Sequence, residues 1–211
     1  MRTGLFLLLF AICPLAVAAE PDESLPVPAD EFVYCTVCHG VQLMGNPIIK
    51  APRLSGMDTW YVERQLMAFK NGWRGAHESD EVGMEMNPMA AVLSDEQIRE
   101  AAEFVSKTRS PLPPVTVDGN VENGRARYMA CAACHGIDGK GNAALGGPAL
   151  TGQNDWYLVT QMENYRDGIR GSHPADVYGM QMRSAVQLLS DDQDIRDVVS
   201  YINTLNTNQG N

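Results

Sequence analysis

Apolar residues recur at helical spacing near the end of each half of the chain. In both places they occupy positions i, i+3, i+4 and i+7, which line one face of a helix. These positions are Ile98, Ala101, Ala102 and Val105 in the first half, and Ile195, Val198, Val199 and Ile202 in the second. Ser94, followed three residues later by Gln97, predicts a capping box at the start of the first of these helices.

Two further helices are predicted upstream, over residues 58–71 and 154–167. Each has apolar residues at helical spacing and is followed at once by a glycine, a common signal for a helix end. A shorter helix is expected before residue 35 and before residue 131, with Phe32 and Tyr128 in equivalent places. Because no run of residues alternates between apolar and polar, no sheet is expected and the predicted fold class is all-α.

The first 19 residues have the pattern of a secretory signal. Arg2 precedes an apolar stretch from Leu5 to Val17, and the small residues around Ala19 offer a cleavage site. The alternative is a retained membrane anchor, but the stretch is short for a span of about 20 residues. We expect a periplasmic protein without its signal and without Cys13, peripheral to the membrane at most.

An internal repeat relates the two halves of the chain. A shift of 96 residues aligns most of the residues that could bind a cofactor or a metal. The aligned pairs include Cys35/Cys131, Cys38/Cys134, His39/His135, Pro52/Pro148, Trp60/Trp156, Tyr61/Tyr157, Arg74/Arg170, His77/His173, Met84/Met180 and Met86/Met182. We therefore expect two tandem domains, over residues 20–108 and 118–211, joined by a proline-rich, extended linker over residues 109–117.

Each half contains a Cys-x-x-Cys pair followed directly by a histidine. Such a pair in an exported protein could form a disulfide, act in redox exchange or bind zinc. The histidine favours a different chemistry, because two thiols at this spacing meet the two vinyl groups of haem and the adjacent imidazole reaches the iron. Cys35, Cys38 and His39, together with Cys131, Cys134 and His135, therefore predict two covalently bound haem c groups.

Acidic residues outnumber basic ones by 26 to 16, which gives a net charge of −10. This excess argues against binding to nucleic acid, whose phosphates attract basic proteins. It is compatible with steering toward a basic patch on a redox partner, and equally with a solvated surface that keeps the protein soluble.

The ligand opposite the histidine on each iron has several candidates. Of the eleven methionines and two remaining histidines, only Met84/Met180, Met86/Met182 and His77/His173 recur in the repeat. A thioether ligand raises the potential of a haem iron relative to a second imidazole. The repeat alone leaves both methionine pairs open.

These motifs together resemble the dihaem cytochrome c4 family, whose two domains are class I cytochromes c. The resemblance covers nearly all of the chain after residue 19, and rests on both haem motifs, on Pro-x-Leu-x-Gly at residues 52–56 and 148–152, and on Tyr-x-x-x-Gln followed by Gly-x-Arg. It implies Met86 and Met182 as the iron ligands, with Met84 and Met180 as packing residues. It also implies that the carbonyls of Pro52 and Pro148 orient the two histidines.

Several other repeated residues have more than one possible role. Arg74 and Arg170 are expected to bind haem propionates, the alternative being ordinary surface ion pairs. The Trp-Tyr pairs at residues 60–61 and 156–157 are expected in the core or between the domains. Pro28 stands where the second half has Gly124, so the first haem helix should be shorter than its counterpart. One extra residue near 192–194 leaves the start of the final helix open.

If the protein supplies both axial ligands of each iron, no position is open for a substrate. The two haems would then pass single electrons, and no enzyme activity is expected. The resemblance implies a periplasmic shuttle between a quinol-oxidising complex or dehydrogenase and a terminal oxidase or reductase. The alternatives are an electron-transfer subunit of a larger redox enzyme and, less favoured, a dihaem enzyme. An enzyme of that kind needs an exchangeable ligand or a further cysteine, and both halves here offer the same methionines.

Overall fold

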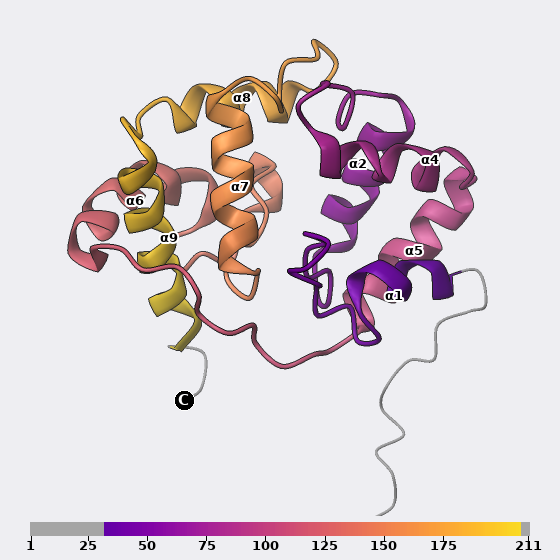
Figure 1. Ribbon diagram of the computed structural model, residues 1–211, viewed down its shortest axis with the longest axis horizontal. Coiled ribbons are helices and arrows are strands. Elements are labelled where there is room, and N and C mark those ends of the chain that lie inside the picture. The colour runs from indigo at the N-terminus through magenta and orange to yellow at the C-terminus, as the bar shows by residue number, and fades with distance from the viewer. Residues whose placement is uncertain (1–31, 208–211) are drawn as a thin grey trace, which may run out of the picture.

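The computed structural model describes residues 32–207 (Figure 1), so the expected signal segment and Pro28 lie outside the described residues. The described residues form helices and no sheet, apart from two isolated bridges, Asn46–Ala51 and Asn142–Gly147. The helices are α1 (Val33–His39), α2 (Thr59–Lys70), α3 (Glu81–Met84), α4 (Met86–Ala91), α5 (Asp95–Lys107), α6 (Val121–His135), the 3₁₀ turn η2 (Ala143–Leu145), α7 (Asp155–Arg166), α8 (Val177–Val186) and α9 (Asp192–Thr207).

The long helices begin and end where local sequence signals place them. Asp58 and Asn154 precede α2 and α7, and Asn71 and Asp167 follow them. The capping box of α5 is confirmed, because the Ser94 hydroxyl accepts from the Gln97 backbone N–H (3.1 Å) and the Ser94 N–H donates to the Gln97 side chain (2.8 Å).

The predicted apolar faces form the centre of each half. All eight positions on α5 and α9 are buried, and α5 packs on α2 while α9 packs on α6 and α7. An aromatic pair joins the haem helix of each half to its last helix. Phe32 stacks on Phe104 at 5.9 Å, and Tyr128 packs on Tyr201 at 5.2 Å. The duplication is therefore visible in the packing as well as in the sequence.

The two haem helices differ in length, as the sequence predicted. Helix α1 has 7 residues and α6 has 15, and α6 lies along α9. Gly124 makes this close packing possible, because a Cβ at that position would collide with the Asp197 carbonyl. In both halves the haem motif forms the last turns of the helix itself, whereas the sequence suggested a helix that precedes it.

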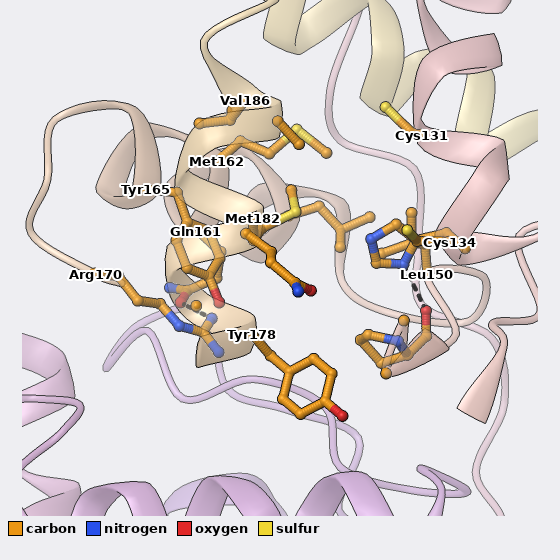
Figure 2. Close-up of a pocket in the computed structure, with 18 of the residues that line it drawn as sticks. Cys131, Cys134, Leu150, Gln161, Met162, Tyr165, Arg170, Tyr178, Met182 and Val186 are labelled. Atoms are coloured by element: carbon orange, nitrogen blue, oxygen red, sulfur yellow. Dashed lines mark hydrogen bonds between the residues drawn. The ribbon is translucent and has the colours of Figure 1, made fainter. Parts of the chain in front are cut away.

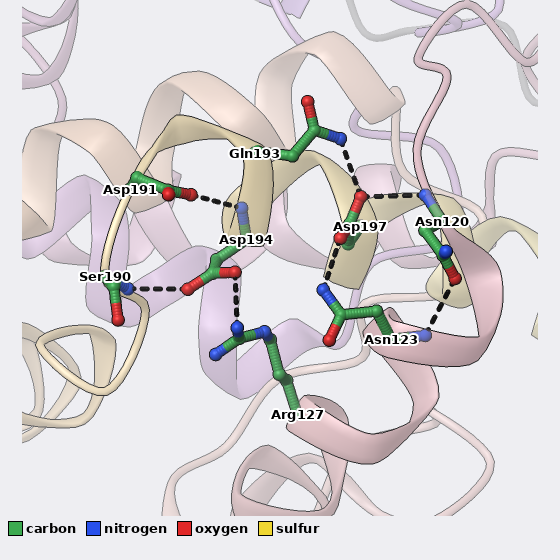
Figure 3. A network of polar contacts seen from close by, with 8 residues as sticks. All are labelled: Asn120, Asn123, Arg127, Ser190, Asp191, Gln193, Asp194 and Asp197. Carbon is green, nitrogen blue, oxygen red and sulfur yellow. Dashed lines mark hydrogen bonds and ion pairs between the residues drawn. The ribbon is translucent and has the colours of Figure 1, made fainter.

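A polar network fixes the start of α9 against α6 (Figure 3). Asp194 accepts from the Ser190 N–H at 2.8 Å and pairs with Arg127 of α6 at 2.7 Å. Asp197 accepts from the Asn120 N–H at 2.7 Å and from the Asn123 and Gln193 side chains. The extra residue of the second half is thus accommodated at the start of α9, at Asp192, where Asp194 accepts from the Ser190 N–H, while Asp197 accepts at the start of α6.

The helices that carry the paired methionines were not predicted. In the second half they form one continuous helix, α8, whereas the first half has α3 and α4 with a break at Glu85. Pro88 stands where the second half has Ser184, and a proline cannot donate to the carbonyl four residues earlier. The break therefore follows from one residue that differs between the halves.

The two halves lie side by side and are joined by an extended segment along one edge of the molecule (Figure 1). Its second end is held by Asp155, which accepts from the Thr116 backbone and hydroxyl (both 2.6 Å) and from the Val117 N–H (2.9 Å). Near its first end, the Arg53 guanidinium donates to Ser110. Over residues 32–207, no helix combines the length and the apolar character needed to span a bilayer.

Candidate haem sites

Each candidate site begins with a buried histidine at the end of a haem helix. His39 and His135 are 6% and 7% exposed, and each ring Nδ1 lies within hydrogen-bond distance of a proline carbonyl, at 2.6 Å from Pro52 and 2.8 Å from Pro148. Because a carbonyl can only accept, Nδ1 carries the proton and Nε2 keeps its lone pair for a metal. Burial lowers the pKa of both imidazoles, against the effect of the carbonyls, and so favours this neutral form.

The four cysteines of the described residues are free thiols, two of them one helical turn before a histidine and two directly before it. Cys35 and Cys131 are half-buried, and burial raises the pKa of both thiols. Cys38 and Cys134 are exposed. In each half, one thiol is thus half-buried and the other exposed, three residues apart on the same helix.

A cavity of about 180 Å³ lies beside the second of these motifs (Figure 2). Cys131 and Cys134 stand on one side of it, Tyr165 and Arg170 stand on the other, and Met182 projects between them. Its remaining lining is mainly apolar and includes Leu150, Leu158, Met162, Val186 and Leu189. The cavity also reaches the other half of the molecule, where Met57, Tyr61, Arg64 and Gln65 line it.

The two methionine pairs differ in where they lie. Met182 lines the cavity and packs against the core of the second half, whereas Met180 does not line the cavity and is 38% exposed. In the first half, Met86 is half-buried at the start of α4 and Met84 is 45% exposed. The residues that the family resemblance implied are thus the more buried member of each pair.

Arg74 and Arg170 form a cluster between the halves rather than surface ion pairs. They are 8% and 5% exposed, and their guanidinium groups donate to glutamine and tyrosine side chains of both halves. Arg74 donates to Gln65 (2.7 Å), Tyr157 (2.7 Å) and Gln161 (3.1 Å), and Arg170 donates to Gln161 (2.6 Å), Gln65 (2.7 Å) and Tyr61 (3.4 Å). Of the two places expected for Tyr61 and Tyr157, the core or the domain interface, the structure shows the interface.

The two guanidinium charges create a positive field in the cluster. Each arginine also has one N–H group, on Nε, that makes no hydrogen bond there. Burial raises the pKa of Tyr61, but the Arg170 and Arg74 charges outweigh it and hold that pKa below its ordinary value. Within residues 32–207, the Nε–H groups of Arg74 and Arg170 are buried and have no hydrogen-bond partner. A buried unpaired donor on a cation is costly, so each Nε–H suits an anionic acceptor such as a carboxylate.

The two repeated histidines have other contacts. The Nδ1 of His77 accepts from the Ser79 N–H and the Nδ1 of His173 from the Ala175 N–H, and the His173 ring stacks on Trp73 across the interface. Neither residue lines the cavity of the second half.

Sequence reasoning missed a second set of contacts between the halves. The Arg64 guanidinium lies 4.6 Å from the Trp60 ring centre and 3.8 Å from that of Tyr178, and it donates to the Gly146 carbonyl at 3.1 Å. The Asn154 side chain accepts from the Arg53 N–H at 2.6 Å. The partners of Arg64 and Arg53 in the other half are about a hundred positions away along the chain, and the repeat does not conserve Arg64 or Arg53, so nothing in the sequence pattern linked them.

The donor set and its surroundings fit covalently bound haem. Two thiols, a neutral imidazole with a free Nε2, an apolar cavity with a thioether inside it and an unpaired guanidinium donor match the vinyl groups, iron, ring and propionates of that group. When bound, the group supplies a one-electron iron couple, and the chain supplies attachment, ligands and the surrounding field.

Comparisons with known proteins agree with this fit. The family profile described as Cytochrome c matches residues 32–109 and again 121–206. Cytochrome c4 from Thiocapsa roseopersicina is 33% identical over 203 residues, which cover 89% of this chain and 96% of the relative. The thiosulfate dehydrogenase electron acceptor of Stutzerimonas stutzeri is 33% identical over 180 residues, covering 79% and 76%. Reduced cytochrome c4 from Pseudomonas stutzeri superposes with a TM-score of 0.63 at 28% identity, covering 82% and 93%.

Proposed function

Because the chain belongs to the dihaem cytochrome c4 family, with two covalent haem c groups in tandem cytochrome c domains, we propose that it is a periplasmic shuttle for single electrons. In this proposal it accepts them from a quinol-oxidising complex or dehydrogenase and delivers them to a terminal oxidase or reductase. The observation that carries the proposal is that both halves offer a buried histidine and a half-buried methionine, the two side chains that would close the coordination of an iron. A closed iron can exchange electrons but has no open position for a substrate.

The residues divide the work in the same way in each half. His39 and Met86 ligate the first iron, and His135 and Met182 ligate the second. The carbonyls of Pro52 and Pro148 hold the imidazoles in the tautomer that ligates, which the 2.6 and 2.8 Å contacts support. The free Nε–H groups of Arg74 and Arg170 bind propionates, which the absence of any other partner for these two atoms supports.

A dehydrogenase as electron donor is supported by one relative. The protein of Stutzerimonas stutzeri is named as an electron acceptor of thiosulfate dehydrogenase, and the present chain spans 76% of it. We propose a donor of the same class, an exported enzyme that oxidises a small inorganic substrate, for this chain.

Substitution of the methionines tests the ligand assignment. We expect Met86→Ala and Met182→Ala each to remove the far-red band of methionine-ligated ferric haem from one haem and to lower its potential. The same changes at Met84 and Met180 serve as matched controls and should leave both haems as they are. Carbon monoxide should bind the ferrous Met86→Ala and Met182→Ala variants but not the native protein. Binding of carbon monoxide by the native protein, or a native spectrum in either ligand variant, would contradict the closed-iron proposal.

A further inference from the structure

Arg64 brings an unpaired positive charge from the first half to the cavity of the second. It extends from α2, passes between the Trp60 and Tyr178 rings and donates to the Gly146 carbonyl, and it is part of the cavity lining. Within residues 32–207, no carboxylate lies within ion-pair distance of its guanidinium. Three contacts, two of them with the other half, fix the position of this charge.

The other charged residues of this cavity do not distinguish the two haem sites. They are Arg127, Arg170 and Asp176. Arg170 and Asp176 have counterparts in the first half, Arg74 and Asp80, each in the same structural role. Arg127 has no arginine counterpart, but Asp194 pairs with it at 2.7 Å and offsets its charge.

Arg64, in contrast, has no equivalent that reaches toward the first site. The repeat places Thr160 at the corresponding position of α7, and the Thr160 hydroxyl donates to the Trp156 carbonyl of its own helix. It also places Val82 where the second half has Tyr178, so the ring that covers Arg64 is missing as well. Arg64 thus places an unpaired cation in the lining of the second cavity, and the equivalent position of the second half, Thr160, places none toward the first site.

We propose that the Arg64 charge raises the reduction potential of the second haem relative to that of the first, and so shifts an electron shared by the two domains toward the second. The equilibrium moves one electron from the first iron, oxidised from Fe(II) to Fe(III), to the second iron, reduced from Fe(III) to Fe(II). A nearby cation favours the less positive of two oxidation states. At an effective dielectric constant of about 20 and a separation of about 10 Å, one unit charge shifts an equilibrium roughly tenfold. For a one-electron couple, a tenfold shift is about 59 mV.

A potentiometric titration of the whole dihaem protein tests this inference, which rests on the proposed function. The wave of the second haem is identified with Met182→His, because a second imidazole lowers the potential of the haem that it ligates. Arg64→Gln removes the charge. We expect it to lower the midpoint potential of the second haem, by an amount equal to about a tenfold change in the equilibrium constant for reduction. The midpoint potential of the first haem should stay unchanged. Arg64→Lys keeps the charge and should retain most of the native separation.

Arg99→Gln is the matched control, because it removes one exposed positive charge of the same half on α5. It should leave the separation of the two waves unchanged. If Arg64→Gln leaves the separation unchanged, or if Arg64→Lys reduces it as much as Arg64→Gln does, the inference is wrong although the proposed function stands. If Met182→His moves neither wave, the ligand assignment of the proposed function fails instead.

Discussion

The interdomain arginine cluster offers the sharpest test of how the two halves are held together, through Gln161→Leu. The side-chain oxygen of Gln161 accepts from both arginines, at 2.6 Å from Arg170 Nη1 and at 3.1 Å from Arg74 Nη2. Leucine is close to glutamine in size but accepts nothing. Arg170 Nη1 then loses its partner within the cluster, while Arg74 Nη2 keeps the Tyr157 hydroxyl at 2.7 Å.

The magnitude follows from this difference between the two donors. A hydrogen bond to a charged group contributes about 1.5–3 kcal/mol, and an orphaned buried donor loses its full share. One orphaned donor and one weakened donor therefore predict that the free energy of unfolding falls by about 2–3 kcal/mol. Gln65→Leu should cost at least as much, because the remaining partner of Arg170 Nη2, the Tyr61 hydroxyl, lies 3.4 Å away.

Urea denaturation of the haem-loaded protein, followed by circular dichroism, measures the change. Gln187→Leu is the control, since Gln187 is exposed and its amide makes a single hydrogen bond, to the Arg166 carbonyl. The double variant Gln65→Leu/Gln161→Leu should cost less than the sum of the two, because one loss already lets water reach the cluster. A free energy within about 0.5 kcal/mol of the native protein for Gln161→Leu would refute the role of the cluster.

Three further changes test the fold around the sites. Donors from Thr116, Val117 and Asn203 hold the pKa of Asp155 below its ordinary value in spite of burial. The contribution of Asp155 to stability is therefore complete above about pH 4 and is lost as the pH falls through the lower pKa of the folded state. Thermal unfolding of Asp155→Asn between about pH 2 and 6 should then depend less on pH than that of the native protein. Gly124→Val should lower the free energy of unfolding by about 1–3 kcal/mol or more, because the new side chain meets the Asp197 carbonyl. Ala126→Val, on the exposed side of α6, should lower it far less. Equal losses for the two variants in urea titrations would contradict this packing. Ser94→Ala should cost about 1 kcal/mol through loss of the α5 capping box, and an unchanged urea midpoint would count against it.

The parts of the molecule that were predictable from sequence are those set by local signals. The bounds of α2 and α7 follow from apolar spacing and from the glycine that comes soon after each helix, and those of α5 follow from apolar spacing and its capping box. The helices α3, α4 and α8 were missed because they are short and rich in methionine and glycine. Asp80 and Asp176 cap α3 and α8, and Gly75 lies so close to the Gly83 carbonyl that a Cβ would not fit. The two caps are local signals, since each aspartate accepts from the N–H three residues later, and only the close approach of Gly75 to Gly83 depends on the tertiary structure.

The repeat guided the site prediction and also limited it. It reduced the candidate ligands to positions shared by both halves. The shared His39 and His135 each end a helix, and each ring lies beside a proline carbonyl. Shared positions cannot reveal a residue that is important in one half alone. Arg64 and Thr160 are such a pair, and the difference became visible only when the structure brought Arg64 next to Tyr178.

The exchange of partners in the arginine cluster has a consequence for the origin of the chain. Each half contributes one Arg, one Gln and one Tyr, and each arginine binds both glutamines and the tyrosine of the opposite half. A contact in which residue i meets j and j meets i is the isologous kind that two identical subunits make in a twofold dimer. Fusion of two such copies would keep the dimer interface and raise its effective concentration through the linker. It would also free each half to change alone, so that a single substitution at an ancestral twofold axis becomes a difference between two redox centres.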